Sequence, residues 1–353
     1  MLTEKVRKAM SSKTQLEVID IHSHLYPRPY IELLKQRDHI PRVVTRNGIE
    51  EFVIFPEEDG PHGVGGRSIG PEFWDLDLKL EFMDKVGIDR TVVSLGNPWL
   101  DPFQGSTGEE AARMVNRFMA DCEATTSGRV VGLGVVPANS VDSAISEASA
   151  IAAIDGLHGL VLGPRVAGLT FDDPALEPFW AEIQSLGLPV FVHPKDGVAL
   201  DALRGYRHVL PVGLGFPMET TIAIARLVLG GVLHRFPDLR LMLAHGGGCL
   251  PYLAGRLDAA WRSDPAVEKQ LPLPPSAYLR RLRLDALVYY GGAFSAAMQL
   301  VGAERLMFGS DHPFTVADPQ ANLETIFAEL EDRNRLANVL AQNAREFFAL
   351  DEA

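Results

Sequence analysis

Residues 16–24 read LEVIDIHSH, an apolar run that ends in the pair His22 and His24. Its content of Val and Ile predicts a β-strand. Side chains two residues apart on a strand point to the same face, so the two imidazoles leave the strand end together and could bind one metal ion. Because two ligands do not complete a metal site, the rest of the chain must supply the others.

Seven further short apolar runs recur through the 353 residues, at 91–95, 130–136, 158–162, 189–193, 240–244, 286–290 and 305–309. Segments of helical period separate most of them, at 76–87, 108–126, 141–154, 174–186 and 219–235. Eight strands alternating with helices predict an α/β fold of the (β/α)8 TIM barrel type, in a single domain over residues 1–353. The competing fold is an open, doubly wound sheet, but no Gly-x-Gly-x-x-Gly follows the first strand to support a dinucleotide-binding version of it.

Two regions interrupt this alternation. Residues 25–75 follow the first strand and are rich in Pro, Gly and charge, so we expect them to form a lid insertion over the active face of the barrel. Residues 265–280 hold four prolines and predict a loop before the seventh strand. The tail, 320–350, predicts two closing helices.

The composition excludes several classes of function. A net charge of −13 argues against a nucleic-acid partner or an anionic membrane surface. No stretch of about 20 uninterrupted apolar residues is present, and the N-terminus lacks the apolar core of a secretory signal. The two cysteines, Cys122 and Cys249, form no disulfide framework. These features predict a cytoplasmic protein with no membrane partner.

Further metal-binding or acid–base residues end other strands of the predicted barrel. His193 ends the fifth strand, His245 the sixth and Asp311 the eighth, and active sites of such barrels lie at these carboxyl ends. Imidazoles with one carboxylate suit Zn²⁺, with Mn²⁺, Fe²⁺ or Co²⁺ as alternatives. The fourth strand ends without a bridging carboxylate or lysine, which favours one metal over two. Because a mononuclear site keeps an open position, one of the five candidates should stand off the metal.

Several motifs resemble those of the amidohydrolase superfamily: IDIHSH (19–24), FVHP (191–194), AHGGG (244–248) and FGSDHPF (308–314). The block GFPMETTIA (215–223) is similar to the branch of non-oxidative decarboxylases that contains aminocarboxymuconate semialdehyde decarboxylase. Within that branch, Arg67, the segment NPW (97–99), Leu210-Pro211 and DHPF (311–314) resemble the isoorotate (uracil-5-carboxylate) decarboxylases most. The resemblance covers residues 16 to 350.

The resemblance implies a carbon–carbon lyase and a role for each matching residue. His22, His24, His193 and Asp311 would bind one divalent metal, Zn²⁺ first and Mn²⁺ as the alternative, with no organic cofactor. His245 would stand beside the metal, and either it or Asp311 would protonate the ring carbon before CO₂ leaves. The implied substrate contacts are Arg67, Asn97 and Phe314, together with Arg256, whose counterpart reaches a carboxylate across a dimer interface. The implied partner is a small carboxylic acid, and the implied assembly is a homodimer or a higher homo-oligomer.

Other functions stay open on the sequence alone. A metal ion held by the same residues could activate a water molecule for hydrolysis of a lactone or an amide. The remaining class of function is a barrel that binds a small molecule without catalysis. The residues Lys195-Asp196-Gly197 after His193 depart from both decarboxylase patterns. The substrate is therefore uracil-5-carboxylate or another aromatic acid, for example a hydroxybenzoate.

Overall fold

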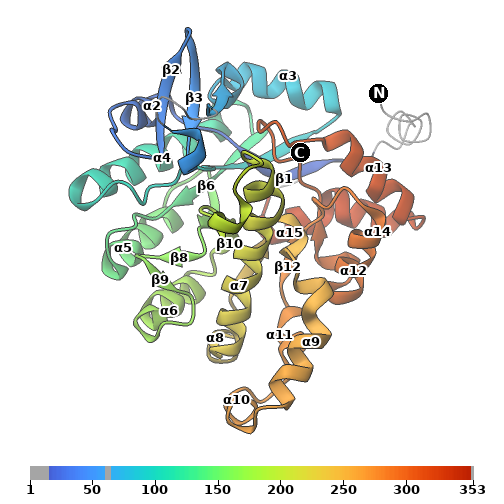
Figure 1. The fold of residues 1–353 in the computed structure, drawn as a ribbon. Coiled ribbons are helices and arrows are strands. Elements are labelled where there is room, and N and C mark those ends of the chain that lie inside the picture. The colour runs from blue at the N-terminus through green and yellow to red at the C-terminus, as the bar shows by residue number, and fades with distance from the viewer. Residues whose placement is uncertain (1–15, 60–64, 351–353) are drawn as a thin grey trace.

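The computed structural model describes residues 16–59 and 65–350 (Figure 1). Its central sheet holds eight parallel strands, which are, in spatial order, β1 (Ile19–His24), β5 (Arg90–Ser94), β6 (Val130–Val135), β7 (Leu157–Leu162), β10 (Pro189–Val192), β11 (Arg240–Leu243), β12 (Arg283–Asp285) and β13 (Leu306–Met307). The chain after β13 lies against β1 and closes the barrel. The Ile21 amide donates to the Phe308 carbonyl at 2.9 Å, and Ser23 forms a parallel β-bridge with His312. The predicted barrel is confirmed.

Helices surround this sheet, and their bounds follow local sequence signals. They are α3 (Leu76–Val86), α4 (Gly105–Thr125), α5 (Val141–Ala152), α6 (Glu177–Leu186), α7 (Phe216–Leu229), α8 (Val232–Arg235), α9 (Leu250–Arg262), α12 (Gly291–Val301) and α13 (Pro319–Glu329). For α3, the Asp75 carboxylate caps the amides of Asp77 and Leu78, and Gly87 ends the helix in the left-handed conformation. The strands read as apolar runs because helices on the outside and packed side chains on the inside bury both of their faces.

Two sequence expectations near the end of the barrel were wrong. The seventh strand is Arg283–Asp285 rather than 286–290, because the chain leaves the sheet after Asp285 and buries Ala286 and Leu287 in a loop. Residues 265–280 are not a loop but hold the short helices α10 (Pro265–Gln270) and α11 (Pro275–Leu279). Their prolines stand in the first turn of each helix, where no amide donor is needed.

The tail consists of α13 and a second helical run formed by α14 (Arg333–Ala337), a π-helical turn (Asn338–Gln342) and α15 (Asn343–Phe348). It therefore agrees with the two closing helices predicted from the sequence.

The predicted insertion, 25–75, has structure of its own and rises at the top of Figure 1 in blue. It holds α2 (Arg28–Lys35) and an antiparallel sheet of β2 (Arg42–Arg46), β3 (Ile49–Val53) and β4 (Arg67–Ile69). Another small sheet, β8 (Arg165–Val166) with β9 (Leu169–Thr170), follows β7. Strand β4 pairs Arg67 with Phe52 and so fixes the position of that arginine. That the insertion acts as a lid stays a prediction.

One helical stretch among the described residues, Pro211–Leu229, is long and apolar enough to cross a membrane by length and composition alone. Half of its most apolar window is buried inside the protein, as in the core helices of many barrels. This stretch is therefore weak evidence for a membrane span.

Candidate metal centre and pocket

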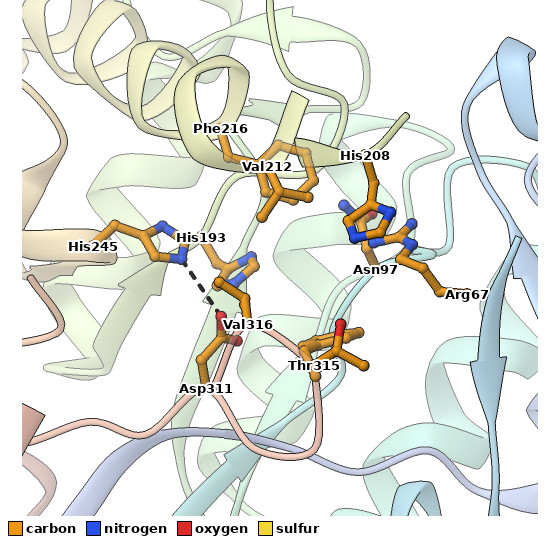
Figure 2. Close-up of a pocket in the computed structure, with 11 residues that line it drawn as sticks. Arg67, Asn97, His193, His208, Val212, Phe216, His245, Asp311, Thr315 and Val316 are labelled. Atoms are coloured by element: carbon orange, nitrogen blue, oxygen red, sulfur yellow. Dashed lines mark ion pairs between the residues drawn. The ribbon is translucent and has the colours of Figure 1, made fainter. Parts of the chain in front are cut away.

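A pocket lies at the carboxyl ends of the barrel strands (Figure 2). It brings together residues from the insertion, from several strand ends and from the segment before α7. Its lining consists of Arg67, Asn97, His193, His208, Val212, Phe216, His245, Asp311, Phe314, Thr315 and Val316. Seven of the eleven residues carry polar or charged side chains, and the other four are apolar. Polar groups that converge beside apolar walls are typical of a small-molecule site.

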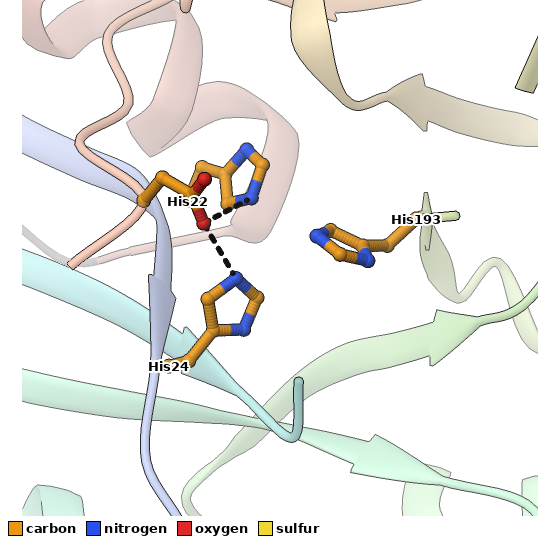
Figure 3. A group of neighbouring side chains, drawn as sticks. His22, His24 and His193 are labelled. Atoms are coloured by element: carbon orange, nitrogen blue, oxygen red, sulfur yellow. Dashed lines mark ion pairs between the residues drawn. The ribbon is translucent and has the colours of Figure 1, made fainter. Parts of the chain in front are cut away.

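Four buried side chains converge at the floor of this pocket (Figure 3). His22 and His24 come from β1, His193 follows β10, and Asp311 follows β13. One ligand atom from each lies within 4.8 Å of the other three. Asp311 Oδ1 is 3.3 Å from His24 Nε2 and 3.5 Å from His22 Nε2. The structure thus brings together the four residues that the sequence predicts as metal ligands.

The orientation of the three imidazoles fits a metal ion. Each ring uses Nδ1 for a contact: His22 with Asp285 Oδ2 at 2.6 Å, His24 with Ser94 Oγ at 3.3 Å, and His193 with the Pro194 carbonyl at 2.6 Å. Each Nε2 is buried and has no hydrogen-bond partner in the part of the chain that the structure describes. Burying one such atom costs about 1–3 kcal/mol. Three of them facing one carboxylate form a donor set suited to a divalent metal.

Metal binding requires neutral imidazoles and an ionised carboxylate. The pKa shifts of His24, His193 and Asp311 suit this requirement, whereas the shift of His22 favours the charged ring. Burial lowers the pKa of His24 to about 4 and holds the pKa of His193 well below its ordinary value. For Asp311, burial opposes ionisation, but contacts with His24 and His22 outweigh burial and lower the pKa. For His22, burial is likewise outweighed, here by the hydrogen bond to Asp285, and the pKa is raised.

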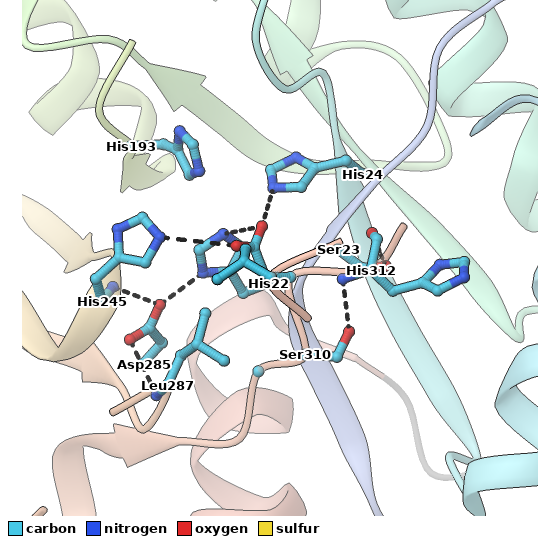
Figure 4. Close-up of polar contacts among 12 residues, drawn as sticks. His22, Ser23, His24, His193, His245, Asp285, Leu287, Ser310 and His312 are labelled. Atoms are coloured by element: carbon cyan, nitrogen blue, oxygen red, sulfur yellow. Dashed lines mark hydrogen bonds and ion pairs between the residues drawn. The ribbon is translucent and has the colours of Figure 1, made fainter. Parts of the chain in front are cut away.

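Asp285, at the end of β12, is a site residue that the sequence reasoning missed (Figure 4). It is fully buried. Its Oδ2 contacts His22 Nδ1 and accepts the His245 amide at 2.8 Å, and its Oδ1 accepts the Gly246 amide at 2.6 Å. A carboxylate behind a ligating histidine fixes the tautomer and the ring orientation. The sequence feature that could have identified Asp285 is its position as the only acidic residue in the segment RLDALV (283–288).

His245 stands beside the group of four rather than in it. Its Nε2 is 4.0 Å from Asp311 Oδ2, and its Nδ1 is buried without a partner. Burial, followed by the charge of His22, lowers the pKa of His245. Both His245 and Asp311 have positive φ angles, 55° and 63°, which are strained for residues other than glycine and which cluster at functional sites.

Arg67 lies in the wall of the pocket with its side chain 13% exposed. Its Nε is 3.7 Å from Glu58 Oε1, and its guanidinium lies 5.3 Å from the centre of the Phe55 ring. Within residues 16–59 and 65–350, neither Nε nor Nη2 has a hydrogen-bond partner. These two nitrogens form one edge of the guanidinium, and that edge can hold a carboxylate through two parallel hydrogen bonds.

The other predicted substrate contacts differ in placement. Asn97 lines the pocket, and its Nδ2 donates one hydrogen bond to the Lys195 carbonyl, which fixes the orientation of the amide. Phe314 lines the pocket and packs 5.2 Å from the His24 ring. Arg256 is exposed on α9 and does not line the pocket of its own chain. Its predicted role across a dimer interface stays a prediction.

The segment after His193 is held by one carboxylate. Glu219 Oε2, from the first turn of α7, accepts the amides of Lys195, Asp196 and Gly197 at 2.9, 3.2 and 2.9 Å. The residues in which this chain departs from the family patterns are therefore fixed by the block 215–223 that carries the resemblance.

His208 also lines the pocket, from the segment before α7. It lies near Arg67, whose charge adds to burial in lowering the pKa of His208. No strand-end position marked this residue, so sequence position alone could not assign it to the site.

The chain is similar to known proteins over most of its length. The amidohydrolase family model matches residues 19–350. The chain is 29% identical to 2-amino-3-carboxymuconate-6-semialdehyde decarboxylase of Dictyostelium discoideum, over 94% of this chain and 92% of that one. It is 28% identical to gamma-resorcylate decarboxylase of a Rhizobium species, over 86% and 98%.

Two solved structures extend the comparison. The IDCase of Metarhizium anisopliae is 33% identical with a TM-score of 0.89, over 97% of this chain and 99% of that one. The 5-carboxyvanillate decarboxylase of Sphingomonas paucimobilis is 25% identical with a TM-score of 0.80, over 96% and 100%.

Proposed function

This chain belongs to the amidohydrolase family, and we propose that it is a metal-dependent, non-oxidative decarboxylase of a small aromatic or heteroaromatic acid. The resemblance to the decarboxylase branch that its motifs indicate is confirmed by relatives that are decarboxylases by name. Those relatives support the assignment of this chain to the carboxy-lyases. Because IDCase is among them, we take uracil-5-carboxylate as the first candidate substrate, and a hydroxybenzoate as the second.

The observation that carries the proposal is the burial of the Arg67 guanidinium in the pocket wall without hydrogen-bond partners for Nε and Nη2 within the described residues. A buried guanidinium with two such nitrogens is costly unless a ligand satisfies it. The carboxylate nearest to the Arg67 guanidinium is that of Glu58 at 3.7 Å, and Arg67 lines a pocket that also contains Asp311 and His193. A neutral lactone or amide offers no carboxylate to such an arginine. The pocket therefore favours an anionic substrate held beside the metal ligands.

The residues can be assigned roles on this basis. His22, His24, His193 and Asp311 would hold a divalent ion, Zn²⁺ by the donor set and Mn²⁺ as the alternative, which supplies Lewis acidity when bound. Arg67 binds the carboxylate. Phe314 and Phe216 pack against the planar ring and keep water away from it.

The proton comes from the pair of Asp311 and His245, whose carboxylate and imidazole lie 4.0 Å apart. It adds to the ring carbon that carries the carboxylate and makes that carbon tetrahedral. The bond to the carboxylate then breaks, its electrons return to the ring, and CO₂ leaves from beside Arg67. A positioned acid of this kind contributes typically 10²–10⁴-fold to a rate.

We expect Arg67→Ala to lower kcat/KM for the carboxylate substrate by roughly 10²-fold, because the loss of a bidentate charge pair is worth about 3 kcal/mol. Metal content, measured by mass spectrometry of the purified protein, should not change, since Arg67 is not in the group of four ligands. Arg67→Lys keeps the charge but loses the planar edge and should recover only part of the activity. An unchanged kcat/KM in Arg67→Ala would contradict the proposal.

The proposed assembly is a homodimer. Met218 and Ile222 of α7 and Tyr252 of α9 are 36%, 45% and 87% exposed, and Arg256 lies one turn after Tyr252. An apolar surface of this kind supports a second copy as the partner. The dimer and the cytoplasmic location stay predictions from the sequence.

A further inference from the structure

Lys79 is a buried cationic side chain that the proposed reaction does not use. It belongs to α3, on the helix face that also buries Met83, and its exposure is 0%. Lysine is almost never fully buried unless it is paired. Lys79 is neither in the group of four ligands nor in the lining of the pocket.

Four polar atoms surround the Lys79 ammonium, and the most distant of them is the His312 carbonyl at 3.5 Å. Its Nζ donates to Ser23 Oγ at 2.8 Å and to the His24 carbonyl at 3.2 Å, and lies 2.6 Å from His312 Nδ1. A lysine has three N–H donors, so all of them are used. The partners are a hydroxyl, two carbonyls and an imidazole rather than a carboxylate, so Lys79 binds these groups as a donor.

These acceptors lie on the two sides of one seam, where the end of β1 meets the segment 310–312. The His24 amide donates to the His312 carbonyl at 2.8 Å, and Ser23 Oγ donates to the same carbonyl at 3.1 Å. The imidazole of His312 stacks on Phe82, also of α3, with ring centres 3.6 Å apart and an angle of 18°. Helix α3 therefore contacts both sides of the seam.

The seam also carries three of the four predicted ligands. His22 and His24 belong to one side, and Asp311 precedes His312 on the other. The distances of 3.3 and 3.5 Å between Asp311 and the two imidazoles depend on the register of these segments. Ser23 points to the opposite face of β1 from His22 and His24 (Figure 4). Because Lys79 donates to Ser23 Oγ, it reaches the seam from behind the metal site.

We propose that Lys79 is a positioning residue for the metal centre, which holds the end of β1 and the segment 310–312 at the spacing that the metal requires. The proposal rests on the metal site described above, but not on the reaction or the substrate. Residues behind a metal ligand commonly change metal affinity by about 10–100-fold when they are replaced.

The test compares metal release from three variants. Lys79→Met keeps the length of the side chain without its donors, and Lys79→Gln keeps N–H donors without the charge. The matched control is Asn116→Leu. Asn116 of α4 is also buried and ties an outer helix to the strand β6 through hydrogen bonds of 2.7 and 3.0 Å to Val135, but β6 carries no ligand.

Zn²⁺ release to a chelator, the visible absorption of the Co²⁺-substituted protein and the melting temperature are measured for each. We expect Lys79→Met to release Zn²⁺ at least about tenfold faster than the unchanged protein and to alter the Co²⁺ spectrum. Lys79→Gln should be intermediate, and Asn116→Leu should lower the melting temperature without changing either metal property. If Lys79→Met does not fold, Lys79→Gln carries the comparison.

Zn²⁺ release and a Co²⁺ spectrum equal to those of the unchanged protein in the Lys79 variants would overturn the inference. Equal losses in the Lys79 and Asn116 variants would also overturn it, because they would show general destabilisation. A protein that binds no metal before any substitution would instead contradict the proposed function.

Discussion

We expect the variant His193→Ala to be purified almost free of metal and to lose nearly all activity, the largest effect of any single substitution considered. His193 is buried, its Nδ1 is held by the Pro194 carbonyl, and its Nε2 has no partner within the described residues. Loss of a direct ligand should exceed the roughly 10- to 100-fold fall in affinity that follows loss of a group behind a ligand. Metal content by mass spectrometry and kcat by CO₂ release measure the two effects.

His208→Ala is the matched control for this variant. His208 lines the same pocket but lies outside the group of four ligands, so the variant should keep its metal. If His193→Ala retained a full equivalent of tightly bound metal, the assignment of the metal centre would be wrong. Loss of metal from both variants would point to unfolding of the site rather than to loss of a ligand.

The second large effect is expected for His245→Ala. This variant should keep its metal, because His245 stands 4.0 Å from Asp311 and outside the group of four. Its kcat should fall by about 10²–10⁴-fold, the usual contribution of a positioned acid or base. The Michaelis constant should change little, because Arg67 rather than His245 binds the carboxylate in the proposed arrangement.

Burial lowers the pKa of His245, so the free imidazole is neutral near pH 7 and can pass a proton between solvent and Asp311. A kcat for His245→Ala within about threefold of the unchanged protein would exclude that role, since a positioned acid contributes typically 10²-fold or more. Asp311 would then be the proton donor without help from His245. His245→Gln, which keeps polar atoms but cannot carry the proton, should lose as much activity as His245→Ala.

The metal ligands were within reach of sequence reasoning because each follows an apolar strand of a regular barrel. His22, His24, His193 and Asp311 could be brought together without coordinates, since parallel strands end at one face. Asp285 was missed because the apolar run after it predicts the seventh strand in its place. That run belongs to a loop, and the strand itself ends at Asp285. A run of apolar residues predicts burial, but a buried segment can be a loop as well as a strand.

Lys79 was hidden for a different reason, and the position of Arg67, which the resemblance had named as a substrate contact, could not be placed from the sequence. Lys79 stands in the apolar face of a helix, and its partners are more than fifty residues away along the chain. Arg67 is placed by the pairing of β3 with β4 inside the insertion, and no helical or strand period in the sequence fixes that register. The prolines of 265–280 suggested a loop, although proline is also common in the first turn of a helix.

The most direct test of the central claim is CO₂ release by the metal-loaded protein in D₂O. The acids offered are uracil-5-carboxylate, gamma-resorcylate and 5-carboxyvanillate, with a panel of lactones and amides beside them. We predict CO₂ from at least one acid, abolished by a chelator, with deuterium in the product at the carbon that lost the carboxylate. No CO₂ from any acid, together with metal-dependent hydrolysis of a lactone or an amide, would contradict the account.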